Sequence, residues 1–266
     1  SPRWPMRPSW AFILLPEKTK SMRISRIFIS HALKEGSLLE VHGETSHYIK
    51  SVLRLRKGWA LILFNGEGYE CPSKIESFGR DSTWLRLGTP EEVHRESPLH
   101  VHLVLGISRG ERMDFAIQKA VELGVDHITP ILTEHCVVRL EETSKADARH
   151  LHWARILRSS LEQCGRNKYP ILDPPTTLDA WLGSRPPVDL EIMLDPQGER
   201  QLRHISGNPK SVRLLVGPEG GFSDNERQHT RSLGFMPIRF GPRILRTETA
   251  VIAGITSAQT LWGDLG

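Results

Sequence analysis

The sequence contains very little cysteine, and the few cysteines are widely spaced. Cys71, Cys136 and Cys164 are the only three among 266 residues, and none of them belongs to a CxxC pair. This spacing argues against a disulfide framework or a cysteine-rich zinc site and is typical of a reducing cytoplasm. The sequence also lacks an apolar run long enough to span a bilayer. We therefore expect a cytoplasmic protein without a membrane partner.

A recognisable metal-binding pattern is also missing. The two close histidine pairs are His100-x-His102 and His150-x-His152. Neither pair has a carboxylate or a cysteine at a spacing that would complete a familiar ligand set. We expect no metal site.

Net charge gives only weak support for a nucleic-acid partner. The formal net charge is +4. Residues 1–98 hold 15 Lys and Arg against 11 Asp and Glu, whereas residues 99–266 hold 20 of each. Residues 1–21 alone account for three of the four excess charges and show no periodic pattern, and Met22 opens the first patterned stretch. We interpret residues 1–21 as a disordered extension or a start-site artefact, so that local basic clusters must carry any argument for nucleic acid.

The first patterned part of the chain, residues 22–93, has the alternation of short β-strands. Turn signals such as Lys57–Gly58 and Asn65–Gly66 separate these runs. One short helix is predicted at residues 44–53. The pattern indicates a small β-barrel-like module, followed by a linker at residues 94–98. The predicted strands are residues 24–29, 38–41, 59–64, 69–75 and 83–87.

Residues 99–266 alternate between apolar runs and amphipathic stretches, which predicts an α/β domain with a parallel sheet and helices on both faces. Short continuous apolar runs such as 190–194 and 212–216 are typical of buried parallel strands. Ser223 and Glu226 form a capping box that opens a helix. Gly124 and Gly165 stand where helices should stop. Further strands are predicted at residues 99–107, 128–132 and 235–240, and further helices at 111–123, 146–164 and 247–262.

Two glycine- and proline-containing loops follow neighbouring predicted strands in this domain. The first has the sequence GPEGG at residues 217–221, and the second begins with GPR at residues 241–243. Loops at the carboxyl ends of parallel strands form the usual ligand crevice of an α/β sheet. Neither loop has the glycine–lysine pattern of a P-loop or the G-x-G-x-x-G of a dinucleotide site. The two loops together predict a cofactor that has no phosphate groups. A single loop of this kind could equally be a tight turn before a capped helix.

Five motifs, in order along the chain, resemble those of the 16S ribosomal RNA uracil-N3 methyltransferases, which belong to the SPOUT superfamily. The resemblance extends from about Met22 to the C-terminus. It rests on ISRGERMD at residues 107–114, IQKAVELG at 117–124, EQCGRN at 162–167, LVGPEGG at 215–221 and GPRILRTETA at 241–250.

The resemblance implies a PUA-like, RNA-binding β-barrel over residues 22–93 and a SPOUT methyltransferase domain over residues 99–266 that ends in a trefoil knot. It implies S-adenosylmethionine (SAM) as cofactor and 16S ribosomal RNA or the small ribosomal subunit as substrate. It further implies a homodimer whose subunits share the active site. Two alternatives remain at this point: a SPOUT enzyme acting on another RNA position, such as a ribose 2′-hydroxyl, and a non-catalytic RNA-binding assembly factor.

Three loops would hold the cofactor: residues 194–196, 216–221 and 240–247. Apolar side chains and loop amides suit adenine, and glycine allows close approach of the backbone. The predicted cofactor-binding residues are Leu194, Leu215, Val216, Gly217, Pro218, Glu219, Gly220, Phe240, Gly241, Ile244, Leu245, Arg246 and Thr247.

Methylation of uracil N3 requires removal of an imide proton, and a guanidinium could stabilise the resulting anion. Arg246 and Arg109 are the candidates for this role, against the alternative of solvated or carboxylate-paired arginines. Glu219 and Glu248 are candidate bases. Glu219 could instead brace its loop, Glu248 could simply favour a helix N-terminus, and solvent could take the proton.

Basic residues on both domains are candidate RNA contacts, since they could supply salt-sensitive phosphate contacts. The alternative for the N-terminal cluster is an ordinary charged surface. For Arg166, which follows a helix end, it is a favourable interaction with the helix dipole. The candidates are Arg23, Arg26, Arg54, Arg56, Lys57, Arg109, Arg112, Arg166 and Asn167.

Overall fold

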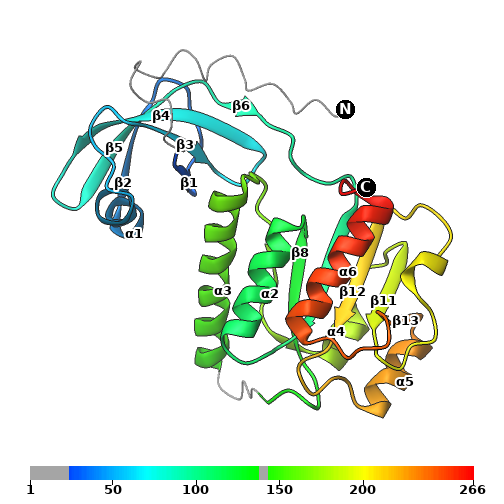
Figure 1. Ribbon diagram of the computed structural model, residues 1–266. Helices are drawn as coiled ribbons and strands as arrows, with labels where there is room; N and C mark the ends of the chain where they lie inside the picture. The colour runs from blue at the N-terminus through cyan, green and yellow to red at the C-terminus, as the bar shows by residue number, and fades with distance from the viewer. Residues whose placement is uncertain (1–23, 138–142) are drawn as a thin grey trace. The chain divides into compact units, whose positions relative to one another are not determined.

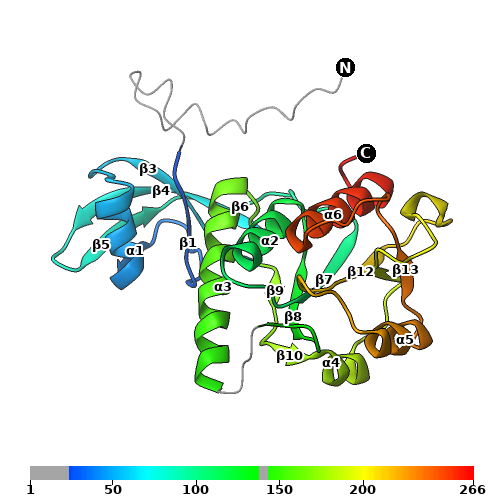
Figure 2. The ribbon, with the colours of Figure 1, turned by 60° about the horizontal axis from the view of Figure 1, so that its bottom comes forward.

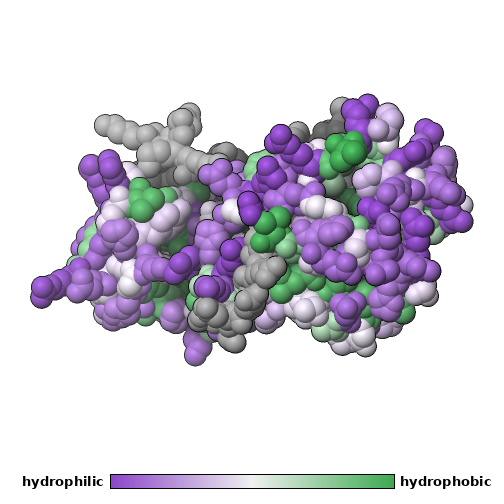
Figure 3. All heavy atoms as spheres, turned by 90° about the horizontal axis from the view of Figure 1, so that it is seen from below, coloured by the Kyte–Doolittle hydropathy of each residue, from purple (hydrophilic) through white to green (hydrophobic). Residues whose placement is uncertain are grey.

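The computed structural model describes residues 24–137 and 143–266. The chain divides into two compact units, the first ending at His94 and the second running from Arg95 to Gly266. The predicted extension at residues 1–21 and the predicted RNA contact Arg23 lie outside the described residues. No helix among the described residues combines the length and hydropathy of a membrane span. On the face drawn in Figure 3, hydrophobic side chains gather only in separate areas among hydrophilic ones.

The first unit is a curled sheet that carries one short helical segment, as expected for the PUA-like module (Figure 1). Strand order is β1-β3-β4-β5-β2, with β6 paired to β4; β1 and β3 are parallel and the other pairs antiparallel. The elements are β1 (Arg26–Phe28), β2 (Leu38–His42), α1 (Gly43–His47), a π-helical turn (Tyr48–Val52), β3 (Ala60–Phe64), β4 (Tyr69–Phe78), β5 (Ser82–Leu87) and β6 (Glu91–Glu92).

Alternate residues of these strands point into one apolar core, as the period of two requires. Leu61 and Leu63 of β3 and Leu85 and Leu87 of β5 are buried there. Burial of such side chains stabilises each by about 1.5–3 kcal/mol. The strand β6 was not predicted, because two glutamates carry no apolar pattern.

The second unit contains a seven-stranded parallel sheet with the order β10-β8-β7-β12-β11-β13, and β9 pairs with β8. Its elements are β7 (His100–Gly106), α2 (Glu111–Glu122), β8 (His127–Leu132), α3 (Thr143–Cys164), β9 (Ile171–Leu172), β10 (Thr176–Thr177), α4 (Leu178–Ser184), β11 (Leu190–Leu194), a 3-10 turn (Leu202–His204), β12 (Ser211–Val216), α5 (Asp224–Ser232), β13 (Met236–Ile238) and α6 (Thr247–Trp262).

Helices cover both faces of this sheet (Figures 1 and 2). Met193 and Leu215 point to one face, where they pack with Trp181 of α4 and where Thr230 of α5 contacts Met193. The neighbouring Leu194 points to the other face, where α6 approaches it at Gly254. The helix α2 packs against α3 and α6 on that face. The predicted α/β architecture is thus confirmed, whereas the trefoil knot stays a prediction.

Local sequence signals explain several helix boundaries. The Ser223 hydroxyl accepts a hydrogen bond from the Glu226 backbone N–H, and the Ser223 N–H donates to the Glu226 carboxylate, so the predicted capping box opens α5. Gly124 adopts a φ of 88° just beyond α2, where a left-handed residue ends the helix. The seven-residue helix α4 was not predicted, because two turns are too short to show a period.

Candidate active site

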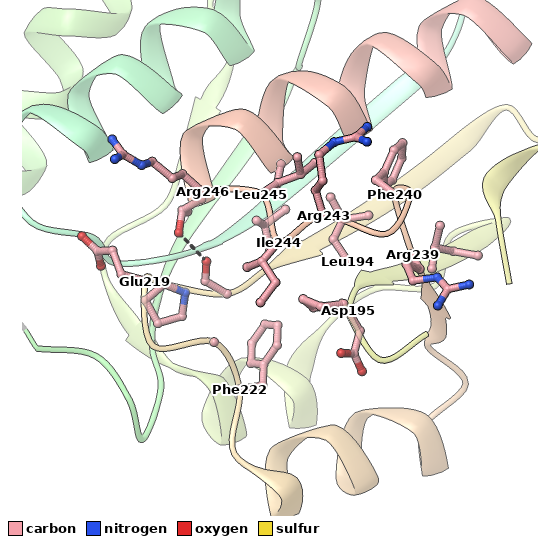
Figure 4. Close-up of a pocket in the computed structure, with 18 of the residues that line it drawn as sticks. Leu194, Asp195, Glu219, Phe222, Arg239, Phe240, Arg243, Ile244, Leu245 and Arg246 are labelled. Carbon is pink, nitrogen blue, oxygen red and sulfur yellow. Dashed lines mark hydrogen bonds between the residues drawn. The ribbon is translucent and has the colours of Figure 1, made fainter. Parts of the chain in front are cut away.

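A pocket lies where three neighbouring strands of the second unit end. Strands β12, β11 and β13 are adjacent and parallel, so their carboxyl ends meet at one edge of the sheet. The loops after Leu194, Val216 and Ile238 surround a cavity of about 330 Å³, shown in Figure 4. This volume falls within the range of about 300–1,000 Å³ that small-molecule sites occupy.

Close backbone packing fixes the loop after β12. Gly106, at the end of β7, leaves room for Pro218: a Cβ atom there would lie only 2.4 Å from the Pro218 nitrogen. The Thr247 hydroxyl donates a hydrogen bond of 3.2 Å to the Gly217 carbonyl, the dashed contact in Figure 4. This bond joins the start of α6 to the β12 loop. The two glycine-containing loops therefore lie together in one wall of the pocket.

Apolar side chains supply much of the pocket lining. Leu194, Ile238, Phe240 and Leu245 line it together with Ile244. Ile244 is 85% exposed and lies among the labelled side chains in the centre of the close-up (Figure 4). An isoleucine this exposed at a pocket mouth offers apolar surface to a ligand. The arrangement suits a flat, largely uncharged group such as a purine.

Glu219 is held as a carboxylate by donors from the segment after β7. Its Oε1 accepts from the Arg109 backbone N–H at 3.1 Å and from the Arg112 guanidinium at 3.2 Å. Partial burial acts to raise the pKa of Glu219. The backbone N–H groups of Glu219 and Arg109, the charge of Arg112 and the Ser108 hydroxyl outweigh it, so the pKa lies below its usual value. Glu219 therefore links the β7–α2 junction to the β12 loop.

Asp195 connects the β11 loop to α5. Its side chain is completely buried, and its carboxylate accepts from the Gln197 backbone N–H at 2.9 Å and from Arg231 at 3.2 Å. The other carboxylate oxygen, Asp195 Oδ1, lies 3.6 Å from the Arg227 Nε atom. In Figure 4 the Asp195 carboxylate points toward α5. Asp195 is thus a buried anion that orients two arginines.

Most of the predicted cofactor-binding residues line this pocket. The exceptions are Leu215, Gly220 and Gly241. Leu215 points to the opposite face of the sheet, because side chains alternate along a strand. Gly220 faces away, with its carbonyl 3.0 Å from His135 Nδ1. The lining residues outside that predicted set are Arg112, Asp195, Pro196, Gly221, Phe222, Arg227, Ile238, Arg239, Arg243 and Ala250.

Two of the four predicted catalytic residues line the pocket and two do not. Arg246 is exposed and lines the pocket as the residue before α6. Glu219 also lines the pocket, with its carboxylate engaged as described above. Arg109 and Glu248 do not line it. Glu248 Oε2 is buried and makes no hydrogen bond within the described part of the chain.

The predicted RNA contacts need correction at Arg26, Arg166 and Asn167. Arg26 forms an ion pair with buried Glu70 and lies over the Phe64 ring. The RNA assignment of Arg26 was wrong, because its guanidinium is engaged inside the first unit.

The Arg166 prediction was also wrong, since this side chain is buried. The Arg166 guanidinium donates to the carbonyls of Val121 and Val125, each at 2.8 Å, and pairs with Glu96. It therefore satisfies the C-terminal end of α2 rather than facing solvent. Asn167 is fully buried beside it, which removes it as a surface contact. By contrast, Arg54, Arg56, Lys57, Arg109 and Arg112 are exposed.

One histidine cluster could suggest a metal site. Ligand atoms of His102, His127 and Asp173 lie within 4.8 Å of one another. The two imidazole rings are stacked in parallel, with centroids 3.8 Å apart and an interplanar angle of 0°. Their lone pairs, which lie in the ring planes, therefore run side by side instead of converging on one ion. Arg213 also donates to His102 Nδ1 at 3.3 Å. This geometry does not favour a cation, and the expected absence of a metal stays a prediction.

Comparison with known families gives the class of the chain. Residues 95–259 match an RNA methyltransferase domain family, and residues 41–87 match an RNA methyltransferase PUA domain family. A methyltransferase from Legionella pneumophila, solved with bound SAM, is 40% identical, with a TM-score of 0.88 over 92% of this chain and 100% of that one. Together with the parallel sheet and its strand-end pocket, these findings define a SPOUT-type RNA methyltransferase.

Curated relatives identify the family more closely. Ribosomal RNA small subunit methyltransferase E of Buchnera aphidicola (subsp. Schizaphis graminum) is 38% identical over 243 residues, covering 91% of this chain and 98% of the relative. The same enzyme from Neisseria gonorrhoeae, solved with S-adenosyl methionine, is 32% identical, with a TM-score of 0.85 over 92% of this chain and 100% of that one. The chain belongs to the ribosomal RNA small subunit methyltransferase E family.

Proposed function

We propose that this protein transfers the methyl group of SAM to N3 of a specific uridine in 16S ribosomal RNA. The observation that carries the proposal is the pocket formed by the ends of β11, β12 and β13. It is supported by two similar proteins that were solved with bound SAM, each of which aligns with 92% of this chain. The pocket fits such a ligand. It has apolar walls and backbone amides, and it has no glycine–lysine phosphate loop.

Leu194, Phe240 and Leu245 would flank the adenine, and Val216 and Gly217 would contact the ligand through their backbone. Gly217 is closely packed within its own loop, because an added Cβ atom would lie 3.2 Å from the Phe222 ring. When bound, SAM supplies an electrophilic methyl group on a sulfonium. Holding this methyl in line with N3 is an orientation effect that lowers the activation barrier.

Arg246 is the residue that we assign to charge stabilisation. The uracil N3–H loses its proton, the N3–CH3 bond forms as the S–CH3 bond breaks, and S-adenosylhomocysteine leaves as a neutral thioether. Negative charge therefore develops on the uracil ring before the methyl is transferred. The exposed guanidinium of Arg246 at the pocket edge can stabilise that charge.

We propose that solvent accepts the N3 proton. Glu219 lines the pocket, but its Oε1 accepts two hydrogen bonds and its pKa is lowered, which makes it a weak base. Glu248 does not line the pocket. Because N3–H must lose its proton, kcat/KM should rise with pH. The Glu219→Gln variant should show the same rise. Loss of that rise would assign the proton to Glu219.

RNA contacts and subunit sharing complete the proposal. The exposed cluster Arg54, Arg56 and Lys57 would bind RNA phosphates, and the substrate would be 16S RNA or the assembled small subunit in the cytoplasm. A homodimer would complete the site with residues from both subunits. Light scattering on the purified protein tests this last point, and a monomer that is fully active would contradict it.

Primer extension tests the function directly. Because N3 methylation blocks Watson–Crick pairing, reverse transcriptase should stop at the modified uridine of 16S RNA. The stop should be lost when the gene is deleted and return when it is restored. A stop that persists unchanged in the deletion strain would contradict the proposal.

A further inference from the structure

We infer that Arg227 binds the carboxylate of the amino-acid part of SAM. The inference rests on the proposed function, because it assigns a residue to one end of the proposed cofactor. SAM joins an adenosyl group, which suits apolar walls, to an amino acid with a carboxylate. An ionised carboxylate enters a partly closed pocket only if a charged or hydrogen-bonding group meets it there.

The arginines that line the pocket differ in burial. Arg112, Arg239, Arg243 and Arg246 are exposed and can reach RNA phosphates outside the cavity. The Arg227 side chain is only 18% exposed, so it is the recessed guanidinium of the pocket. A recessed, desolvated guanidinium interacts more strongly with an anion than an exposed one, because solvent screens it less. Arg227 is therefore best placed to recognise an anionic group inside the cavity.

Arg227 also has hydrogen-bonding capacity to spare. Its Nη1 donates to the exposed carboxylate of Asp224 at 3.3 Å. Its Nε is buried and lies 3.6 Å from Asp195 Oδ1, so this atom faces the aspartate and not the ligand. Its Nη2 lies under the β12 loop, 3.8 Å from where a Cβ atom of Gly221 would stand. Nη2 carries two N–H donors and makes no hydrogen bond within the described residues, so it is the part of the guanidinium that can meet a ligand carboxylate.

Asp195 keeps this guanidinium in place. Its fully buried carboxylate lies 3.6 Å from Arg227 Nε, and it is itself fixed by Gln197 and Arg231. An ion pair longer than a hydrogen bond orients the arginine without using up its donors. Asp195 is thus a positioning residue, and Arg227 is the residue that would touch the ligand.

Two ligands that differ only in the amino-acid part provide the test. S-Adenosylhomocysteine and 5′-methylthioadenosine are both neutral thioethers with the same adenosyl group, but only the first has the amino acid. Calorimetry should give a dissociation constant for S-adenosylhomocysteine that Arg227→Met raises about 10- to 100-fold, as expected for hydrogen bonds to a charged group. The constant for methylthioadenosine should stay within about twofold, which also shows that the variant folds.

Arg203→Met is the matched control, because Arg203 is an exposed arginine of the same unit that does not line the pocket. It should leave both constants nearly unchanged. Arg227→Lys, which keeps the charge but not the planar fork, should recover part of the lost affinity and replaces the Met variant if that variant does not fold. Equal weakening of both ligands, or no weakening of S-adenosylhomocysteine, would overturn the inference. A wild-type protein that binds neither SAM nor S-adenosylhomocysteine would instead contradict the proposed function.

Discussion

Replacement of Gly106 by alanine should disturb the cofactor pocket by pushing against the loop after β12. Gly106 ends β7, next to β12 in the sheet. An added Cβ would lie 2.4 Å from both the nitrogen and Cδ of Pro218 and 2.9 Å from the Gly217 carbonyl carbon. Ordinary contacts begin at 3.4 Å, so the β12 loop would have to move by about 1 Å. The neighbouring atoms include backbone, which cannot turn aside as a flexible side chain can.

The expected cost has two parts. Overpacking of this kind typically destabilises a protein by about 1–3 kcal/mol. A shift of about 1 Å in residues that position a reacting group can reduce catalysis by about 100-fold. We expect SAM to bind at least about tenfold more weakly, measured by calorimetry, with a lower midpoint in thermal unfolding.

Gly183→Ala is the matched control. Gly183 lies in α4, has no described atom within 4 Å of an added Cβ, and does not have a positive φ. Alanine there should be neutral or should stabilise by about 0.5–1 kcal/mol. If Gly106→Ala bound SAM as the wild type does and melted at the same temperature, the close packing of β7 against the β12 loop would not be what shapes the pocket.

Three further predictions address catalysis, acid stability and RNA binding. Arg246→Ala should lower kcat by about 100- to 1,000-fold, whereas Arg239→Ala, at another exposed pocket arginine, should cost less than about tenfold; near-normal turnover of the Arg246 variant would remove this residue from the reaction. Burial, followed by the charges of His127 and Arg213, lowers the pKa of His102 from 6.5 to about 2. Below pH 6.5 the His102 imidazole therefore takes up a proton in the unfolded chain but stays neutral in the folded protein. The free energy of unfolding should fall by up to about 1.4 kcal/mol for each pH unit below 6.5. Urea titrations should show a shallower fall for His102→Gln, and identical slopes would contradict the assignment. Alanine at Arg56 and Lys57 together should reduce the slope of log affinity for RNA against log salt by about 0.7–0.9 per lost phosphate contact, and an unchanged slope would remove the cluster from the interface.

Periodic and capping signals predicted the second unit well because they are local. The apolar run at Leu190–Leu194 and the capping box at Ser223 produce β11 and α5 as expected. The short strands β9 and β10 and the helix α4 have too few residues to show a period. Their formation depends on packing against β8 and on the core around Trp181.

The site was predictable where it depends on loop sequence and not where it depends on long-range pairing. The residues around Gly217 and Leu245 line the pocket because they follow β12 and β13, the two strands that flank β11. Arg166 looked like a surface cation after a helix. Its partners, the carbonyls of Val121 and Val125, stand 45 and 41 residues away along the chain. Arg227 gave no signal, since its place in the pocket beside Asp195 joins two segments that lie far apart along the chain.

The most direct test of the central claim is the methylated base formed by the purified protein. Small subunits from the deletion strain, incubated with the protein and SAM carrying a labelled methyl group, should yield labelled N3-methyluridine at one position on nuclease digestion and mass spectrometry. The Arg246→Ala protein should yield little or none. Label in ribose 2′-O-methyl nucleosides, or no labelled nucleoside from a protein that binds SAM, would contradict the account.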